Sequence, residues 1–214
     1  MDAEVFRAWI ARAAEVVEAS RDHLTQLDAA IGDADHGINL SRGFTAVLDA
    51  LGAQPEPGVP GAILTLTGNT LISKVGGASG PLYGTALRRA GQALGDAADV
   101  GLPELAAALE AALAGVQSLG AAREGDKTMV DALAPATRAF SKAIAEGAAP
   151  AEAFRALAEA ARAGAVATIG MQARKGRASY LGSRSVGHED PGAASTVLIL
   201  DALASTAVAT EAAP

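Results

Sequence analysis

Three aspartates stand close together in the stretch LDAAIGDADHGIN, where the first predicted helix ends. Asp28, Asp33 and Asp35 follow the spacing D-x4-D-x-D, and Gly32 lets the chain turn so that their carboxylates point toward one place. Converging carboxylates repel one another unless a cation lies among them, and hard oxygen ligands select magnesium or calcium. The spacing therefore predicts a divalent-cation site. The alternative is a solvated loop that caps the next helix.

The residues after Asp33 argue against one common type of cation site, the calcium-binding EF-hand loop. An EF-hand fits poorly, because the twelfth position counted from Asp33 is Phe44, where that loop needs a bidentate glutamate. His36 and Asn39 follow the aspartates directly, and by themselves they are equally compatible with ordinary helix caps.

A second candidate is the glycine-rich stretch GGASGPLYG at residues 76–84. Its small residues let backbone N–H groups face an anion, and Ser79 adds a hydroxyl group. Pro81 is typical of the first turn of a helix, whose positive end would point at the same place. The alternative is a tight turn between helices with Ser79 as the N-cap.

The stretch GAAREGDKT at residues 120–128 resembles a phosphate-binding P-loop but departs from it. Asp126 is inserted before Lys127, and a helix rather than a strand precedes the stretch, so it is not a Walker motif. Gly120, Thr128 and Met129 could instead line an apolar slot for a flat ring, with core packing as the alternative for the methionine.

A break of about twenty residues, 172–192, is longer than an ordinary connection between helices, and long loops tend to be lids or binding loops. An arginine in a lid can neutralise phosphate charge, whereas a solvated basic loop is the plainer reading. The break contains the cations Arg174, Lys175, Arg177 and Arg184, and it ends in the turn Asp190, Pro191 and Gly192.

Apolar residues recur at helical spacing through most of the chain, and no convincing strand is found. We predict an all-α protein in which residues 1–214 form one domain. The predicted helices cover residues 2–28, 38–51, 61–74, 80–95, 103–119, 128–145, 151–171 and 193–209.

Composition excludes several kinds of protein. The net charge is −7 and the basic residues form no long block, which argues against nucleic acid or an anionic membrane as partner. The absence of cysteine excludes disulfides and thiolate chemistry. The N-terminus lacks the features of a signal peptide, and the late apolar stretch contains Asp201, which favours a buried helix over a membrane span. We expect a soluble cytoplasmic protein.

The four stretches described first, at residues 28–39, 76–84, 120–129 and 172–192, together supply the parts of an all-helical nucleotide site. These parts are metal-binding carboxylates, an anion-binding helix start, a slot for a ring and a basic lid. Phosphoryl transfer needs mainly positioning and charge neutralisation, and no nucleophile from the protein. This requirement agrees with the absence of a Ser-His or Cys-His arrangement.

The stretches LDAAIGDADHGINL, GGASGPLYGTAL, GDKTMVDAL and GRASYLGSRSVGHEDPGAAS closely resemble the nucleotide-binding L subunits (DhaL) of bacterial dihydroxyacetone kinases, in the same order and over nearly the whole chain. The resemblance implies a barrel of eight antiparallel helices with the nucleotide at one end. One departure is Ala34, where the family commonly has glycine. We expect it to matter little, because it projects no functional group.

The resemblance also assigns site residues. Asp28, Asp33 and Asp35 would hold two magnesium ions that bridge to the diphosphate of ADP. Arg177 is the one catalytic group that it implies, a lid arginine acting on phosphate charge. The implied nucleotide contacts are His36, Gly37, Ile38, Asn39, Ala78, Ser79, Gly120, Met129, Arg177, Asp190, Pro191 and Gly192.

In the phosphotransferase-system branch of the family, ADP stays bound like a coenzyme and is ATP only transiently. A phosphohistidine protein fed from phosphoenolpyruvate rephosphorylates it, and the phosphoryl group passes to dihydroxyacetone on a separate K subunit. A free-standing chain that begins with its own first helix favours this branch. The phosphoryl donor, the exact acceptor sugar and the oligomeric state, a homodimer included, stay open.

Three other readings remain. Some L subunits serve ATP-dependent kinases of ketoses or tetroses. The N-terminal part of fatty-acid kinases has a related aspartate motif, but such chains continue into further domains. The third reading is a nucleotide-loaded regulatory protein that binds a transcription factor, against which the intact Asp28, Asp33, Asp35 and Arg177 argue.

Overall fold

The computed structural model describes residues 1–54 and 58–211, which form nine α-helices and two 3-10 helices with no strand among them. The all-α prediction is therefore confirmed for these residues, whereas residues 55–57 and 212–214 of the predicted domain lie outside them. The elements are α1 (Ala3–Ala19), α2 (Arg21–Ile31), α3 (His36–Gly52), α4 (Pro60–Lys74), α5 (Ser79–Leu94), α6 (Leu102–Gly120), α7 (Val130–Ala145), α8 (Pro150–Ala167), η1 (Thr168–Gly170), η2 (Arg177–Ser185) and α9 (Pro191–Glu211).

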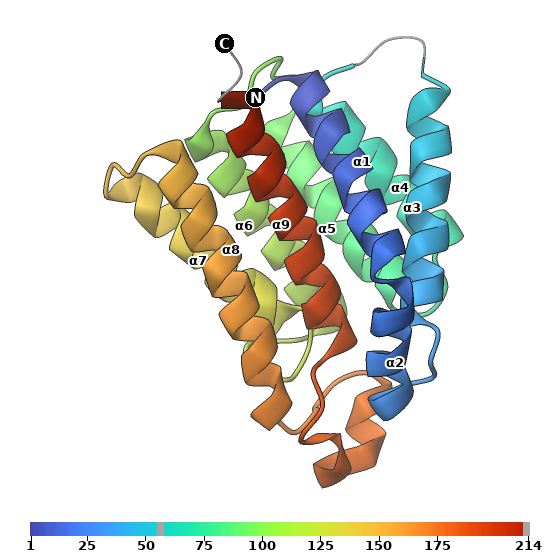
Figure 1. Ribbon diagram of the computed structural model, residues 1–214. Helices are drawn as coiled ribbons and strands as arrows, with labels where there is room; N and C mark the ends of the chain where they lie inside the picture. The colour runs from blue at the N-terminus through green and yellow to red at the C-terminus, as the bar shows by residue number, and fades with distance from the viewer. Residues whose placement is uncertain (55–57, 212–214) are drawn as a thin grey trace.

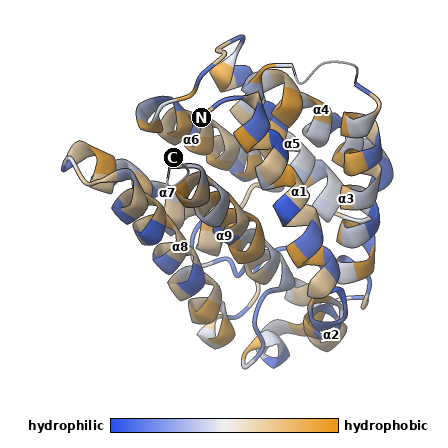
Figure 2. Cartoon of the chain, turned by 45° about the horizontal axis from the view of Figure 1, so that its top comes forward, coloured by the Kyte–Doolittle hydropathy of each residue, from blue (hydrophilic) through white to orange (hydrophobic). Residues whose placement is uncertain are grey.

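Eight of the helices contact one another in a closed ring. From α3 to α9 each helix packs against the next, α9 packs against α1, and α1 packs against α3. The short helices α2 and η2 contact each other at the end of the molecule away from the N-terminus (Figure 1). Each helix carries both hydrophobic and hydrophilic residues (Figure 2), and the fully buried core includes Phe6, Phe44, Phe140 and Phe154.

Local sequence signals explain where several helices begin. The Asp2 carboxylate caps α1 by accepting hydrogen bonds from two N–H groups of its first turn, at 3.0 and 3.1 Å. Pro60, Pro103 and Pro150 lie in the first turns of α4, α6 and α8, where a missing N–H leaves no hydrogen bond unmade.

The predicted helix over 2–28 is wrong in one respect, because the chain bends at Ser20 and forms α1 and α2. The hydrogen-bond ladder continues through the bend: Ser20 N–H donates to the Val16 carbonyl at 3.0 Å, and Leu24 N–H donates to the Ser20 carbonyl at 2.9 Å. The bend therefore costs little and needs neither glycine nor proline. The helix predicted over 151–171 is also shorter than expected. The α-helix α8 ends at Ala167, and the chain then forms the 3-10 helix η1.

Helix α9 is the one helix in the described part of the chain that is long and apolar enough to cross a membrane by length and composition. Of the segment Pro191–Thr210, 44% is buried inside the protein, where the helix contacts α1, α7 and α8. Its apolar character therefore serves the core of this fold.

Helices α4 and α5 approach each other through four glycines that form two reciprocal pairs. A Cβ atom on Gly68 would lie 2.5 Å from the Gly84 carbonyl oxygen, and one on Gly91 would lie 2.5 Å from that of Gly61. The converse contacts are 2.6 Å and 2.7 Å. We call this contact the glycine seam. It brings the backbones of α4 and α5 close together, with the side chains of Ile72 and Arg88 packed beside it.

A fifth glycine makes a testable contact between α7 and α8. Pro135 lies inside α7 and has no N–H to donate to the Asp131 carbonyl, and Gly164 of α8 packs over that oxygen. A Cβ atom on Gly164 would lie 2.0 Å from it. We expect Gly164→Ala to destabilise the protein by about 1–3 kcal/mol in urea unfolding, as overpacked sites do.

The matched control is Gly52→Ala at the end of α3, because a Cβ atom there meets nothing within 4 Å. This change should alter the free energy of unfolding by no more than about 0.5 kcal/mol. Equal effects of the two substitutions would show that the α7–α8 contact can relax around a methyl group.

Candidate functional site

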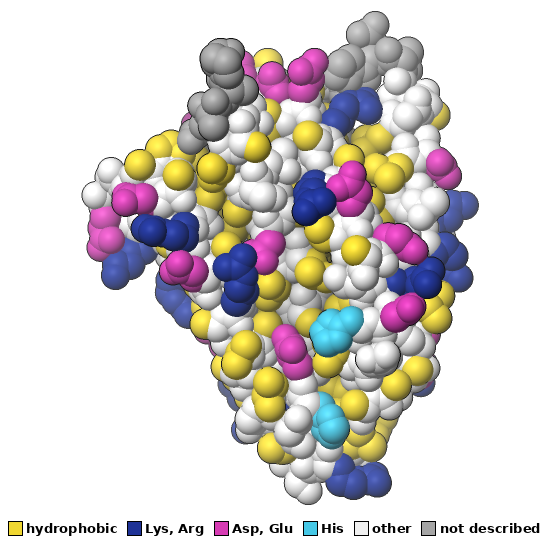
Figure 3. Space-filling view, viewed as in Figure 1, with side chains coloured by type: hydrophobic (Ala, Val, Ile, Leu, Met, Phe, Trp, Pro, Cys, Tyr) yellow, Lys and Arg dark blue, Asp and Glu magenta, His cyan; other side chains and the backbone are white. Residues whose placement is uncertain are grey.

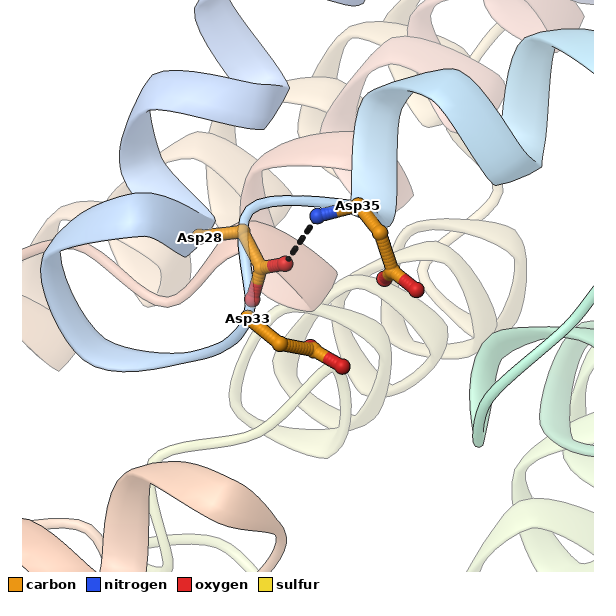
Figure 4. A group of neighbouring side chains, drawn as sticks. All are labelled: Asp28, Asp33 and Asp35. Carbon is orange, nitrogen blue, oxygen red and sulfur yellow. Dashed lines mark hydrogen bonds between the residues drawn. The ribbon is translucent and has the colours of Figure 1, made fainter.

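The three predicted metal-binding carboxylates come together in the structure. Asp28 lies in the last turn of α2, Asp33 in the connection that follows, and Asp35 directly before α3. One oxygen atom from each carboxylate lies within 4.8 Å of the others, and Figure 4 shows the three side chains around the turn. Asp28 is buried, and its Oδ2 accepts hydrogen bonds from the backbone N–H groups of Asp35 at 2.9 Å and His36 at 3.2 Å.

The turn itself is built for this convergence. A Cβ atom on Gly32 would lie 1.9 Å from Asp28 Oδ1, so a larger residue would displace that carboxylate. Ala34 has φ +61°, in the left-handed region that costs an L-residue about 1–2 kcal/mol. The expectation that alanine matters little at this position overlooked the backbone, because the left-handed conformation favours glycine. The donor set of three carboxylates fits a hard divalent cation.

The carboxylates form one side of a cavity of about 380 Å³. Of the predicted site residues, those that line it are Asp28, Asp33, Asp35, His36, Ala78, Ser79, Gly120, Thr128, Met129, Arg177, Asp190, Pro191 and Gly192. They come from α2, the turn after it, α3, the start of α5, the end of α6, the start of α7, the connection between α8 and α9 (residues 168–190), and the start of α9. We call this connection the lid. The fold thus gathers segments that are far apart in the sequence.

Three predicted residues do not line the cavity, although they belong to the first turn of α3. Gly37 packs against the Arg21 carbonyl oxygen, which would be 2.0 Å from an added Cβ atom. Ile38 is 50% exposed, and the Asn39 side chain accepts a hydrogen bond from Arg42 at 2.8 Å. Their side chains therefore form no part of the cavity wall.

A hydrogen-bonded chain runs from the cavity wall to the buried side of α9. His36 is buried, with Nδ1 2.9 Å from the Ser79 hydroxyl and Nε2 2.8 Å from the Ser195 hydroxyl. Tyr83 lies 2.7 Å from Ser195 and donates to the Gly192 carbonyl at 2.9 Å. Burial lowers the pKa of His36, against the charges of Asp28 and Asp35, and this favours the neutral imidazole. The Nδ1 atom of His36 holds the Ser79 hydroxyl in place through their hydrogen bond.

Sequence reasoning missed Tyr83, Ser195 and Thr196, whose hydroxyl groups join this chain. The signal for the last two was present. Adjacent serine and threonine residues in an otherwise apolar helix must find buried hydrogen-bond partners.

The lid places one arginine next to the carboxylates. Arg177, the first residue of η2, forms an ion pair with Asp33 at 3.0 Å, and the two side chains are 69% and 37% exposed. Lys175 also lines the cavity, whereas Arg174 and Arg184 are exposed and do not. An exposed ion pair contributes at most about 1 kcal/mol, so Arg177 can exchange Asp33 for another anion at little cost.

Asp190 lines the cavity and caps α9. Its carboxylate accepts a hydrogen bond from Ala193 N–H at 2.7 Å, and its own N–H donates to the Thr168 hydroxyl at 3.0 Å. Burial raises the pKa of Asp190 to about 7, against the Ala193 hydrogen bond and the positive charge of Lys127.

This raised pKa predicts a pH-dependent stability. Between about pH 4 and pH 7 the unfolded chain releases the Asp190 proton that the folded protein keeps, so stability falls as pH rises through that window. We expect Asp190→Asn to remove a slope of about 1 kcal/mol per pH unit from the free energy of unfolding. Urea unfolding of both proteins from pH 4.5 to 7.5 measures the difference, and parallel profiles would contradict the shift.

Comparison with known proteins places the chain among relatives. Residues 30–205 match the DAK2 domain family. The ADP-binding subunit DhaL of PEP-dependent dihydroxyacetone kinase from Escherichia coli K12 is 44% identical over 196 residues, 92% of this chain and 93% of that protein. The ADP-binding subunit DhaL of PEP-dependent dihydroxyacetone kinase 2 from Listeria innocua is 40% identical over 206 residues, 95% of this chain and 94% of that protein.

Solved structures give the same relationship. The native crystal structure of the C. freundii dihydroxyacetone kinase has a TM-score of 0.73 at 28% identity, covering 96% of this chain but 34% of that one. Its complex with AMP-PNP and Mg2+ has a TM-score of 0.67 at 29% identity, covering 95% and 33%. The chain thus spans about a third of the C. freundii enzyme. Because the family model covers most of the chain and the two subunits match over nearly their full lengths, the protein belongs to the DAK2 family, within its DhaL group.

Proposed function

We propose that this chain is the nucleotide-carrying L subunit of a phosphoenolpyruvate-dependent dihydroxyacetone kinase. The observation that carries the proposal is one cavity lined by three converging carboxylates, the start of α5 and a lid arginine. We further propose that residues 1–214 act as one domain, and that the closed ring of helices is the eight-helix barrel of the family, with the nucleotide at the end where α2 and η2 meet.

In this proposal Asp28, Asp33 and Asp35 hold two Mg2+ ions, whose chemistry is to neutralise the charge of the phosphates. Ala78 and Ser79 contact the phosphates at the N-terminus of α5, which favours anions. His36 orients Ser79. Gly37, Ile38 and Asn39 act through the backbone at the start of α3, because their side chains lie outside the cavity wall.

Other residues hold the base and close the site. Gly120 and Met129 line the adenine slot, where Val116 and Leu119 of α6 supply apolar surface. Arg177 stays at the carboxylates but exchanges its ion pair with Asp33 for phosphate oxygens, whose charge it neutralises during transfer. The turn Asp190, Pro191 and Gly192 closes the cavity on the α9 side.

In the proposed reaction the phosphoryl donor is a phosphohistidine protein, and the acceptor is dihydroxyacetone bound to a K subunit. The reaction takes place in the cytoplasm. Tightly held ADP becomes ATP only between these two transfers. The face in Figure 3 carries acidic and basic side chains interspersed, and the net charge is −7, which supports protein partners rather than nucleic acid.

The test is to denature the purified protein without added nucleotide and to identify what is released by ion-exchange chromatography and mass spectrometry. Near-stoichiometric ADP supports the proposal. An empty protein that binds ATP reversibly would favour an ATP-dependent sugar kinase, and one that binds neither nucleotide in Mg2+ would leave the regulatory reading. Loss of thermal stability in EDTA supports metal-dependent retention, because a bound ligand stabilises by mass action.

A further inference from the structure

Lys127 has a buried ammonium group that the proposed reaction does not use. Its side chain is 1% exposed, although lysine is almost never fully buried without partners. Its backbone has φ +62°, in the left-handed region. Both the left-handed backbone and the buried charge are unfavourable, so other contacts must stabilise Lys127 in this position. Phosphate binding by a P-loop is not the explanation, because the stretch 120–128 is not a Walker motif.

The ammonium group joins the two ends of the lid. Lys127 Nζ donates one hydrogen bond to the Thr168 carbonyl, at 2.5 Å, and another to the His188 carbonyl. Thr168 follows α8 directly, and His188 lies shortly before the start of α9, so the segment between these carbonyls contains the whole of η2 with Arg177. The lysine thus bridges the points where the lid leaves and rejoins the ring of helices.

The loop that carries Lys127 is itself fixed. The Asp131 carboxylate, in the first turn of α7, accepts hydrogen bonds from Gly125 N–H at 2.5 Å and Thr128 N–H at 2.8 Å. The Asp126 carbonyl accepts from Arg174 N–H at 3.0 Å, which attaches the first part of the lid to the same loop. Lys127 therefore acts from a rigid support rather than from a mobile one.

Three carboxylates compensate the positive charge of Lys127. Asp190, Asp131 and Glu189 attract the ammonium group and oppose the effect of burial, which lowers the pKa of Lys127. An ammonium group offers three donors and no acceptor, so it can bind two carbonyl oxygens at once. A neutral side chain of similar length without donors would leave both carbonyls without this partner.

We propose that Lys127 is a positioning residue for the lid, which holds both ends together so that Arg177 stays beside the metal-binding carboxylates. The proposal rests on the proposed function for the reaction that the lid serves. The position of the lid can be measured without that reaction.

The experiment uses the fact that the chain contains no cysteine. Lys127→Cys introduces a single thiol, which is alkylated in denaturant and then refolded. 2-Bromoethylamine gives a side chain that restores an ammonium group at nearly the length of lysine. 1-Bromopropane gives a neutral side chain of the same shape, which is the matched control.

Two readouts separate positioning from general stability. Trypsin cleavage after Arg174, Lys175, Arg177 and Arg184 measures opening of the lid, whereas cleavage after Lys142 and Arg155 in α7 and α8 measures global opening. Because hydrogen bonds from charged donors are among the strongest in proteins, we expect lid cleavage at least about tenfold faster in the neutral derivative. The ammonium derivative should restore the slow rate, and cleavage in α7 and α8 should change much less.

Phosphoryl transfer gives an independent check. The neutral derivative should keep its nucleotide but transfer with a lower kcat, and the ammonium derivative should recover. Equal lid cleavage in the two derivatives would overturn the positioning role, whether or not transfer occurs. If lid cleavage differs as expected but no transfer is seen even with the unmodified chain, the proposed function fails and the positioning role stands.

A further variant tests the proposal even if the alkylated proteins do not refold. Lys127→Gln, expressed directly, keeps an amide donor but no charge, and we expect lid cleavage between the rates of the two derivatives. If neither neutral side chain allows the protein to fold, Lys127 is a requirement of the fold as a whole, and the specific role in the lid is overturned.

Discussion

Replacing Arg177 by lysine should lower kcat for phosphoryl transfer by about 1,000-fold, the smaller end of the range for arginines that neutralise transferred phosphoryl groups. The substitution keeps the positive charge but removes the planar group that binds two oxygens at once. Nucleotide retention should change little, because Arg177 is largely exposed and its ion pair with Asp33 is weak. The effect should therefore appear in kcat rather than in binding.

The assay follows transfer from the phosphohistidine donor to dihydroxyacetone in the presence of the K subunit. Arg184→Lys is the control, because Arg184 lies in the same 3-10 helix but does not line the cavity. Full activity of the Arg177→Lys protein would mean that a single positive charge suffices and that bidentate contact has no role.

Asp33→Asn should lower phosphoryl transfer by at least about 100-fold, since charge neutralisation by a metal ion is worth several kcal/mol in a transition state. The change is isosteric and alters one carboxylate of the cluster. The backbone N–H groups of Asp35 and His36, which shape the turn, donate to Asp28 and not to Asp33. The purified variant should also lose ADP, because an incomplete set of carboxylate ligands holds divalent cations less firmly against a diphosphate.

Asp49→Asn provides the control for charge, because Asp49 is exposed on α3 and away from the cavity. The released nucleotide, quantified after denaturation, should be near stoichiometric in the control and low in Asp33→Asn. An Asp33→Asn protein with normal ADP content and unchanged Mg2+ dependence would remove this residue from the metal site.

The helices were largely predictable because the apolar period, the capping aspartate and the early prolines are local signals. The bend at Ser20 was not, since the hydrogen bonds around it continue and no residue marks it. The conformation of Ala34 was missed for a related reason. A left-handed φ is a property of the backbone, and an alanine gives no sign of it.

The site residues likewise fall into two groups, those with a local signal in the sequence and those without one. Asp28, Asp33 and Asp35 lie within eight residues, so their spacing alone predicted a cluster that the structure forms. The roles of Tyr83 and Lys127 depend on contacts with residues far away in the sequence, at the start of α9 and at the ends of the lid. Such contacts have no signal in one sequence, and only the folded arrangement reveals them.

The glycine seam has a consequence for the entropy of ligand capture. Helix α5 begins with Ser79 at the cavity and packs closely against α4 at paired glycines, which have no rotamers to lose. The order of this wall is complete once the chain has folded, so an arriving anion meets groups that are already in place. The entropic cost of binding then falls on the opposite wall, where the exposed Arg177 must be immobilised.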